Sequence, residues 1–412
     1  MTWHAPFSIA LCTTILIGSD ARANGFGATL RLTADAVHTA SAGFYAVPSA
    51  FLPVNERSTK QNLELNGQKN GFNFTATLSN RAFRGSKSKH AQFFNELYYD
   101  TQLAGQEISI GRKITSWGVG FGFRPLDVIQ QENRRSLYQN TLKGVNLLAW
   151  EKFGETSALS VVWSNPGRSE VTEPTLDQSV AVRYFNSLNS TDLHTLARYS
   201  KRTGTQLGLG LSKIVGDAVE WHASLLWQRH YHKNLNSLAR HQSPVLLSQT
   251  DPFIEQAFNN ALEALVRMSW THSSGWGVLG EIWYYQTAYN DHQWRALNAL
   301  TAQQRGLLGA AEIPDDAVYG NIAWNRQAYL QRNLRQWNML LRISRQGAAF
   351  EPSLELLYNP EDGGLVTTGR LGYISDWQQF EVGLRRFGGT DGSVWSQMPD
   401  DGQVYLSWRV NF

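Results

Sequence analysis

Alternation of apolar and polar residues is the dominant pattern from residue 24 to the C-terminus. In residues 218–230, valine, tryptophan, alanine and leucine occupy every second position, and residues 276–284, 337–344 and 365–373 repeat this period of two. Such a period is typical of a strand whose two faces meet different surroundings. The pattern predicts about 18 strands, an even number. They fall near residues 25–38, 60–66, 71–81, 91–102, 106–116, 142–152, 157–164, 178–186, 193–200, 205–214, 218–230, 261–271, 276–287, 335–344, 349–358, 365–374, 377–387 and 402–412.

The connections between these strands alternate between long and short. Long ones span 39–59, 117–141, 165–177, 231–260, 288–334 and 388–401, and short turns such as Ala104-Gly105 separate them. A β-sandwich shows similar strands but has no reason for this alternation, whereas a barrel in an outer membrane has short periplasmic turns and long external loops. Only closure satisfies every backbone hydrogen bond in lipid. The sequence therefore predicts an all-β fold, a single transmembrane antiparallel β-barrel with both termini periplasmic.

Two of the long external loops carry helical patterns. Trp294, Leu297 and Leu300 predict an amphipathic helix within 291–309, and Asp251-Pro252 has the form of an N-cap and first-turn proline before apolar residues in 254–262. Two interpretations remain open for the loops 231–260 and 288–334: surface packing over the barrel mouth, or binding of a specific partner.

Composition agrees with a barrel and argues against other classes. Charged residues make up 17% of the chain, while it contains 15 Trp, 15 Tyr and 19 Phe, and the mean hydropathy is −0.35. Disordered chains have few aromatic residues, and no run of about 18 apolar residues indicates a membrane-spanning helix. Alternation explains why the mean hydropathy resembles that of a soluble protein, because apolar lipid-facing residues and polar lumen-facing residues are averaged together.

The N-terminus predicts secretion. An apolar run at residues 6–18 precedes Ala21-Arg22-Ala23, which has the form of a cleavage site, although Lys and Arg are missing before the apolar run. Residues 1–23 are therefore predicted to be a signal peptide and 24–412 the mature barrel. The single cysteine, Cys12, lies in the signal peptide, so we expect neither disulfides nor thiolate metal sites in the mature chain.

The last strand carries the most specific local pattern. Apolar residues occupy alternate positions up to the final residue: Val404, Leu406, Trp408, Val410 and Phe412. In this the chain resembles the outer-membrane β-barrel proteins of Gram-negative bacteria, whose insertion machinery reads an alternating last strand that ends in Phe. The resemblance implies a place in the outer membrane, with the membrane lipid and that machinery as partners.

Charged residues at positions opposite the apolar face should point into the barrel lumen. An Arg facing lipid at mid-depth would cost about 2–4 kcal/mol. The predicted lumen-facing charges are Glu263, Arg267, Glu281, Arg342, Glu355, Arg370, Glu381, Arg385 and Arg409. Two interpretations stay open: Arg–carboxylate pairs that stiffen the wall, or an Arg ladder that gives anions or acidic polymers a path.

The segment 111–139 combines small residues with basic ones. Gly118, Gly120 and Gly122 allow close backbone approach, so the loop 117–141 could fold inward as a constriction or remain a solvated external loop. The arrangement resembles porin-like and alginate-export-type barrels. This resemblance implies that Arg112, Lys113 and Arg124 line or narrow the pore.

Other chemistry has little support in the sequence. We expect no cofactor, no metal, no nucleic-acid partner and no catalytic site. His241 with Ser243 is a weak candidate for lipid hydrolysis, and His222, His230 and His232 form a metal set without an evident further ligand. The predicted function is a passive porin-like channel or exporter for small or anionic hydrophilic solutes. The alternatives are a barrel enzyme acting on lipid or surface polymer, and an adhesin or scaffold that acts through its loops.

Overall fold

The computed structural model describes residues 25–39, 43–51, 57–83, 87–132, 137, 142–165, 177–239, 245–347 and 349–412. Within these ranges the chain forms strands and, in one connection, helices. The strands are β1 (Phe26–Thr39), β2 (Arg57–Lys69), β3 (Phe72–Phe83), β4 (Lys89–Leu103), β5 (Gln106–Lys113), β6 (Val145–Phe153), β7 (Ser157–Asn165), β8 (Ser179–Leu188), β9 (Thr191–Ser200), β10 (Gly204–Val215), β11 (Val219–Asn236), β12 (Phe253–Thr271), β13 (Trp276–Tyr285), β14 (Trp337–Arg345), β15 (Phe350–Asn359), β16 (Gly364–Ile374), β17 (Gln378–Gly389) and β18 (Asp400–Asn411).

These strands form a single closed sheet. Each pairs antiparallel with its neighbours in the chain, and β18 pairs with β1 from Thr29↔Asn411 to Thr39↔Asp400, which joins the two edges of the 18-stranded sheet. The prediction of a closed antiparallel barrel of about 18 strands is confirmed. Closure leaves no unpaired edge, as a lipid-embedded sheet requires.

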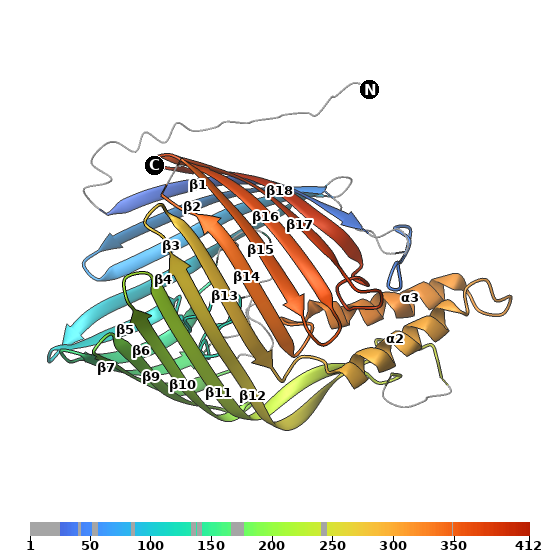
Figure 1. Ribbon diagram of the computed structural model, residues 1–412, viewed down its shortest axis with the longest axis horizontal. Helices are drawn as coiled ribbons and strands as arrows, with labels where there is room; N and C mark the ends of the chain where they lie inside the picture. Colours follow the sequence, from blue (N-terminus) through green and yellow to red (C-terminus); the bar gives the residue numbers. More distant parts are fainter. Residues whose placement is uncertain are drawn as a thin grey trace.

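The two ends of the barrel differ. At the end where β1 begins and β18 finishes, which we call the turn end, the connections are tight, as at Asn70-Gly71 and Ala104-Gly105. At the opposite end, the loop end, lie the connections 114–144, 237–252 and 286–336. Figure 1 shows the helices beyond the loop end and the C-terminus at the other. None of the helices that the structure describes is long and apolar enough to cross a membrane.

Alternate strand positions face outward and carry the apolar side chains. On β10, the outward-facing Leu207, Leu209 and Leu211 are all exposed, while Gln206, which faces the interior, is buried. Exposed Leu, Val, Ile, Trp, Tyr and Phe recur around the outer wall. The outer face is therefore an apolar belt, with most of the polar strand positions directed inward.

The predicted helix at 254–262 is wrong, because these residues belong to β12. They pair with the end of β11, where Tyr231 lies opposite Phe258 and their rings stack at 5.3 Å, and Asp251 accepts a hydrogen bond from Phe253 N instead of starting a helix. Residues 231–236 and 253–259 thus extend the barrel as a two-stranded ribbon, and the loop expected at 231–260 shortens to 237–252.

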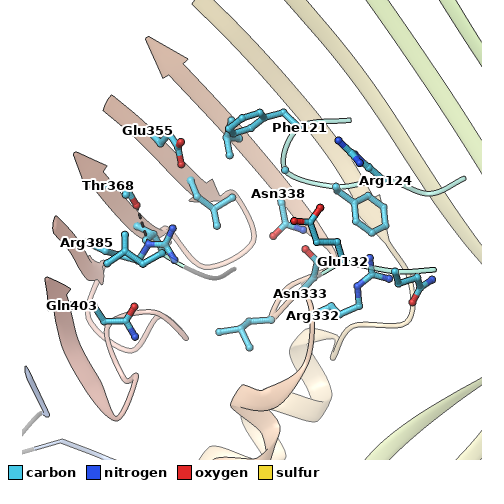
Figure 2. Close-up of a pocket in the computed structure, with 18 of the residues that line it drawn as sticks. Phe121, Arg124, Glu132, Arg332, Asn333, Asn338, Glu355, Thr368, Arg385 and Gln403 are labelled. Carbon is cyan, nitrogen blue, oxygen red and sulfur yellow. Dashed lines mark hydrogen bonds between the residues drawn. The ribbon is translucent and has the colours of Figure 1, made fainter. Parts of the chain in front are cut away.

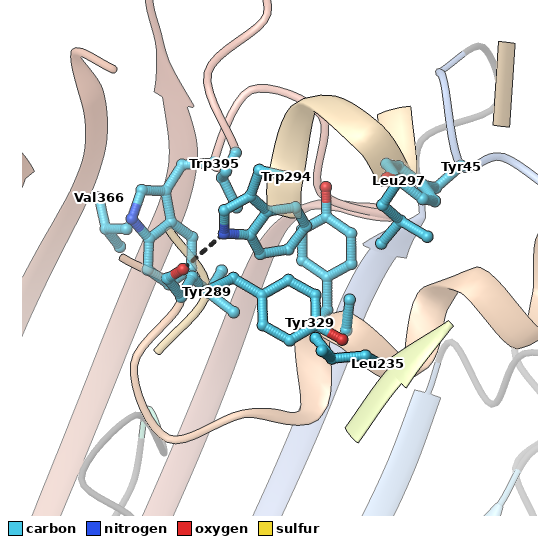
Figure 3. Packing of buried hydrophobic residues seen from close by; sticks show 11 residues of the cluster. Tyr45, Leu235, Tyr289, Trp294, Leu297, Tyr329, Val366 and Trp395 are labelled. Atoms are coloured by element: carbon cyan, nitrogen blue, oxygen red, sulfur yellow. Dashed lines mark hydrogen bonds between the residues drawn. The ribbon is translucent and has the colours of Figure 1, made fainter. Parts of the chain in front are cut away.

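The long connection 286–336 forms a helical cap at the loop end. It contains the expected helix, α2 (Asp291–Arg305), then α3 (Asp315–Asn325) and a 3₁₀ helix, η1 (Arg326–Leu330). Asn290 and Gln293 cap α2 reciprocally. Figure 3 shows the aromatic cluster beneath the cap. It joins residues from distant elements: Tyr45, Leu235, Tyr289, Trp294, Leu297, Tyr329, Val366 and Trp395.

Candidate functional site

The segment 114–132, which follows β5, crosses the barrel interior. Its Phe121 N and Gly122 N donate to the carboxylate of Glu281 on β13, the latter at 2.6 Å, and Val119 O accepts from Arg267 on β12 at 2.8 Å. Because β12 and β13 lie on the far side of the closed sheet from β5, these contacts require the segment to pass through the lumen. We call residues 114–132 the inward segment.

Asp127 organises the start of the inward segment. It is 3% exposed and accepts hydrogen bonds from Trp117 N and Gly118 N, both at 2.6 Å, and from Ser116 Oγ at 2.9 Å. Burial raises the pKa of the Asp127 carboxyl above its usual range, although the hydrogen bonds and Arg124 oppose that shift. The backbone turns tightly between Gly120 and Phe123, where a Cβ on Gly120 would lie 1.7 Å from Phe123 O.

An apolar core joins the inward segment to one half of the wall. Trp117, Leu126, Val128 and Ile129 pack against inward side chains of β6 to β11: Leu147, Ala149, Val162, Ala181, Leu196 and Leu226. These contacts hold the inward segment against that side of the wall.

A cavity of about 1200 Å³ occupies the other half. Strands β14 to β18 and β1 form its outer wall, and the inward segment and the residues after η1 form its inner side (Figure 2). Among the residues that the structure describes, its lining contains seven basic and five acidic side chains. The basic ones are Arg81, Arg124, Lys143, Arg332, Arg342, Arg370 and Arg385, and the acidic ones are Asp35, Asp127, Glu132, Glu355 and Glu381.

Charged and hydroxyl side chains line the outer wall in one row across four strands. Arg342 pairs with Glu355, Glu355 with Thr368, and Thr368 with Arg385 in the registers of β14 to β17. Arg342 Nε lies 3.3 Å from Glu355 Oε1, and Arg385 Nε donates to Thr368 Oγ1 at 2.9 Å. Arg370 in the next row also contacts Glu355. Two guanidinium groups therefore contact one carboxylate, and a third binds the neighbouring hydroxyl.

Aromatic rings face this row from the inward segment. The Arg342 guanidinium lies 5.0 Å from the centre of the Phe121 ring, and Phe123 stacks on Trp283 at 6.1 Å. Arg332, in the connection after η1, lies 5.8 Å from the Phe123 ring. The cavity thus combines a basic wall with an aromatic one.

The structure separates the predicted pore residues into several groups. Cavity-lining residues include six of them: Arg124, Arg342, Glu355, Arg370, Glu381 and Arg385. Arg267 and Glu281 hold the inward segment instead of lining the cavity. Lys113 also points inward, where its Nζ lies 3.3 Å from Asp100. Arg409 is on the inward side of β18, opposite Arg31, and donates to Asn411 at 3.2 Å.

Arg112 was expected in the pore and lies on the outer face. It pairs in register with Leu97 and Asn146 and shares its face of β5 with Ile110, which is 54% exposed. The expectation came from the resemblance to porin-like barrels, which implied that both Arg112 and Lys113 line the pore. Adjacent strand residues point to opposite faces, so only one of the two can be inside.

Several cavity residues escaped the sequence analysis because they do not lie on regular strands. Phe121, Arg332 and Asn333 come from connections, where periodicity gives no direction. The catalytic candidates His241 and Ser243 lie outside the described residues. Within the described ranges no three His, Asp or Glu side chains gather for a metal ion, and His222 instead contacts Glu220 and Ser212.

Comparison with solved structures places the fold among outer-membrane porins. The barrel is similar to OccAB1 of Acinetobacter baumannii, with a TM-score of 0.54, 6% identity and coverage of 94% of this chain and 96% of that one. It is also similar to OpdK of Pseudomonas aeruginosa, with a TM-score of 0.52, 10% identity and coverage of 94% and 98%. OpdK has also been solved with vanillate. No family model and no curated protein sequence matches the chain.

Proposed function

We propose that this protein is a passive outer-membrane channel for small hydrophilic solutes, with a preference for anions. The observation that carries the proposal is the one-sided cavity of about 1200 Å³ inside a closed barrel, where basic side chains outnumber acidic ones. A charged lining in a low-dielectric wall concentrates ions of opposite sign. The path runs between the inward segment and the wall of β14 to β18.

Two further points support this function. The fold is that of porins, and the structure of OpdK with vanillate shows a carboxylate compound with a protein of this fold. A carboxylate with a flat ring also suits the chemistry of this cavity, because its lining combines the guanidinium groups of Arg342 and Arg385 with the ring of Phe121. The inward segment then serves as the constriction that sets the size limit.

Solute selectivity tests this proposal. Purified protein in liposomes should admit benzoate faster than a cation of similar size. It should also admit benzoate faster than an uncharged benzyl glycoside, whose sugar group prevents it from crossing the lipid directly. The double variant Arg342→Gln and Arg385→Gln should reduce anion flux severalfold, since it removes two guanidinium groups from the row. Equal flux of anions and cations through the unaltered protein would contradict the anion preference.

The matched control is Arg345→Gln with Lys213→Gln. Both residues are basic and exposed, but they lie on outward positions of β14 and β10. These changes remove the same charge without touching the lumen. Anion flux should remain at the level of the unaltered protein.

A further inference from the structure

Arg112 carries its charge on the outer face of the barrel, within the apolar belt. Its register partner Leu97 on β4 is 48% exposed. Phe94, which lies further toward the loop end on β4, is 49% exposed. The apolar surface of the neighbouring strand therefore continues past Arg112 toward the loop end, so the backbone of Arg112 lies within the apolar belt.

Two backbone irregularities fix Arg112 in this position. Gly111 has φ 130°, a conformation that L side chains rarely adopt, and a Cβ there would lie 2.3 Å from Leu97 O. On β4 the pairing shifts by one residue, so that Asn95 forms a bulge beside Phe94. The exposed carbonyl of Phe94 accepts from Arg112 Nη1 at 3.3 Å, and Asn146 Oδ1 accepts from Nε at 3.3 Å.

The guanidinium has no carboxylate partner among the residues that the structure describes. Its contacts there are one carbonyl and one amide oxygen, which leave N–H groups directed away from the protein. A lone Arg on a lipid-facing wall is costly. A ligand with anionic oxygens would remove that cost.

The described outer wall is poor in carboxylates that another copy of this chain could bring to Arg112. Its outward strand positions carry basic side chains near both rims: Arg57, Lys69, His90, Lys152, Lys213, Arg229, Arg345 and Arg386. The outward carboxylates on the described strands are Glu255, in the ribbon of β12, and Asp401, which contacts His38 at the loop end of β18. Both of these carboxylates already contact a basic side chain, Arg202 and His38 respectively. The membrane is therefore the better source of the complementary charge.

We propose that Arg112 and Asn146 form a binding site for the phosphate group of a lipid in the leaflet at the loop end. The proposal rests on the membrane location given by the proposed function. The forked guanidinium would donate to two phosphate oxygens, and the long side chain would extend from the apolar belt toward the headgroup region. The loop end would thereby hold one ordered lipid on the outer wall of β4 to β6.

Native mass spectrometry with lipid A as the probe tests the site. The folded protein in neutral detergent should retain lipid A, whereas Arg112→Gln should bind about tenfold more weakly, because a charge-assisted bidentate contact is lost. Lys213→Gln, an outward basic residue near the turn end, is the matched control and should bind as the unaltered protein does. Equal retention by Arg112→Gln and the unaltered protein would overturn the proposal.

A second measurement needs no variant and covers the case in which Arg112→Gln fails to fold. The unaltered protein should bind lipid A about tenfold more tightly than the same lipid with its phosphates removed, and millimolar inorganic phosphate should not compete. Equal affinity for the two lipids would overturn the proposed site. So would a mass spectrum in which the unaltered protein is present only as an oligomer without lipid. Ion conductance by the same preparation separates the two ideas, because a conducting barrel without lipid selectivity contradicts only this site.

Discussion

Two buried carboxylates, Glu281 and Asp127, hold the inward segment by its backbone. Both accept hydrogen bonds from main-chain N–H groups, and Glu281 is 2% exposed. The sequence identified Glu281 as an inward residue from alternation alone. It could not reveal that the partner is a loop backbone, because backbone donors are present in every segment and leave no sequence signal.

Glu281→Gln should loosen the inward segment. The neutral amide keeps the shape but weakens two hydrogen bonds to a charged group, each worth about 1.5–3 kcal/mol. We expect more frequent current fluctuations through the channel and a lower free energy of unfolding. Glu351→Gln, which alters a carboxylate near a turn at the opposite end, is the control, and unaltered fluctuations in Glu281→Gln would contradict the role of Glu281.

At the scale of elements, the strands were predictable and their irregularities were not. Most strand limits agree with the pattern to within a few residues. Two strands contain backbone irregularities. In β4 Asn95 forms a bulge, and in β12 Asn260 has φ 58° where the buried face changes from Ala261 to Phe258. Such reversals remove the period of two from the sequence, so a helix was predicted where the ribbon lies.

The helical cap is held by one buried arginine. Arg335 is 2% exposed; it contacts Asp291 at the start of α2, and its Nε lies 3.3 Å from Glu361 and 3.6 Å from Asp362 in the connection between β15 and β16. Three carboxylates around a single guanidinium join the cap to the barrel wall. Sequence spacing gives no indication of this cluster, because its members come from two separate connections.

Arg335→Ala should release the cap without opening the barrel. Removing one partner of a buried charge cluster leaves uncompensated carboxylates and typically costs about 3–5 kcal/mol. Amide hydrogen exchange should rise in 291–330 and stay slow in β6 to β10. Arg295→Ala, an exposed change on α2, is the control, and unchanged exchange in the cap of Arg335→Ala would show that the aromatic cluster alone holds it.

At the scale of the whole molecule, the inward segment divides the barrel interior. It packs against apolar side chains of β6 to β11, and the charged cavity runs along β14 to β18 and β1. Alternation in the sequence could assign side chains to the inside. It could not show this division, because the division depends on where one long loop packs.

Single-channel recording in a planar lipid bilayer tests the central claim most directly. The purified, folded protein should produce discrete conductance steps in symmetric KCl, and with a salt gradient the reversal potential should have the sign of an anion-preferring pore. The steps should be smaller than those of an open barrel of 18 strands, because the inward segment crosses the lumen and narrows it. Correctly inserted protein that shows no conductance at any applied voltage would contradict the account.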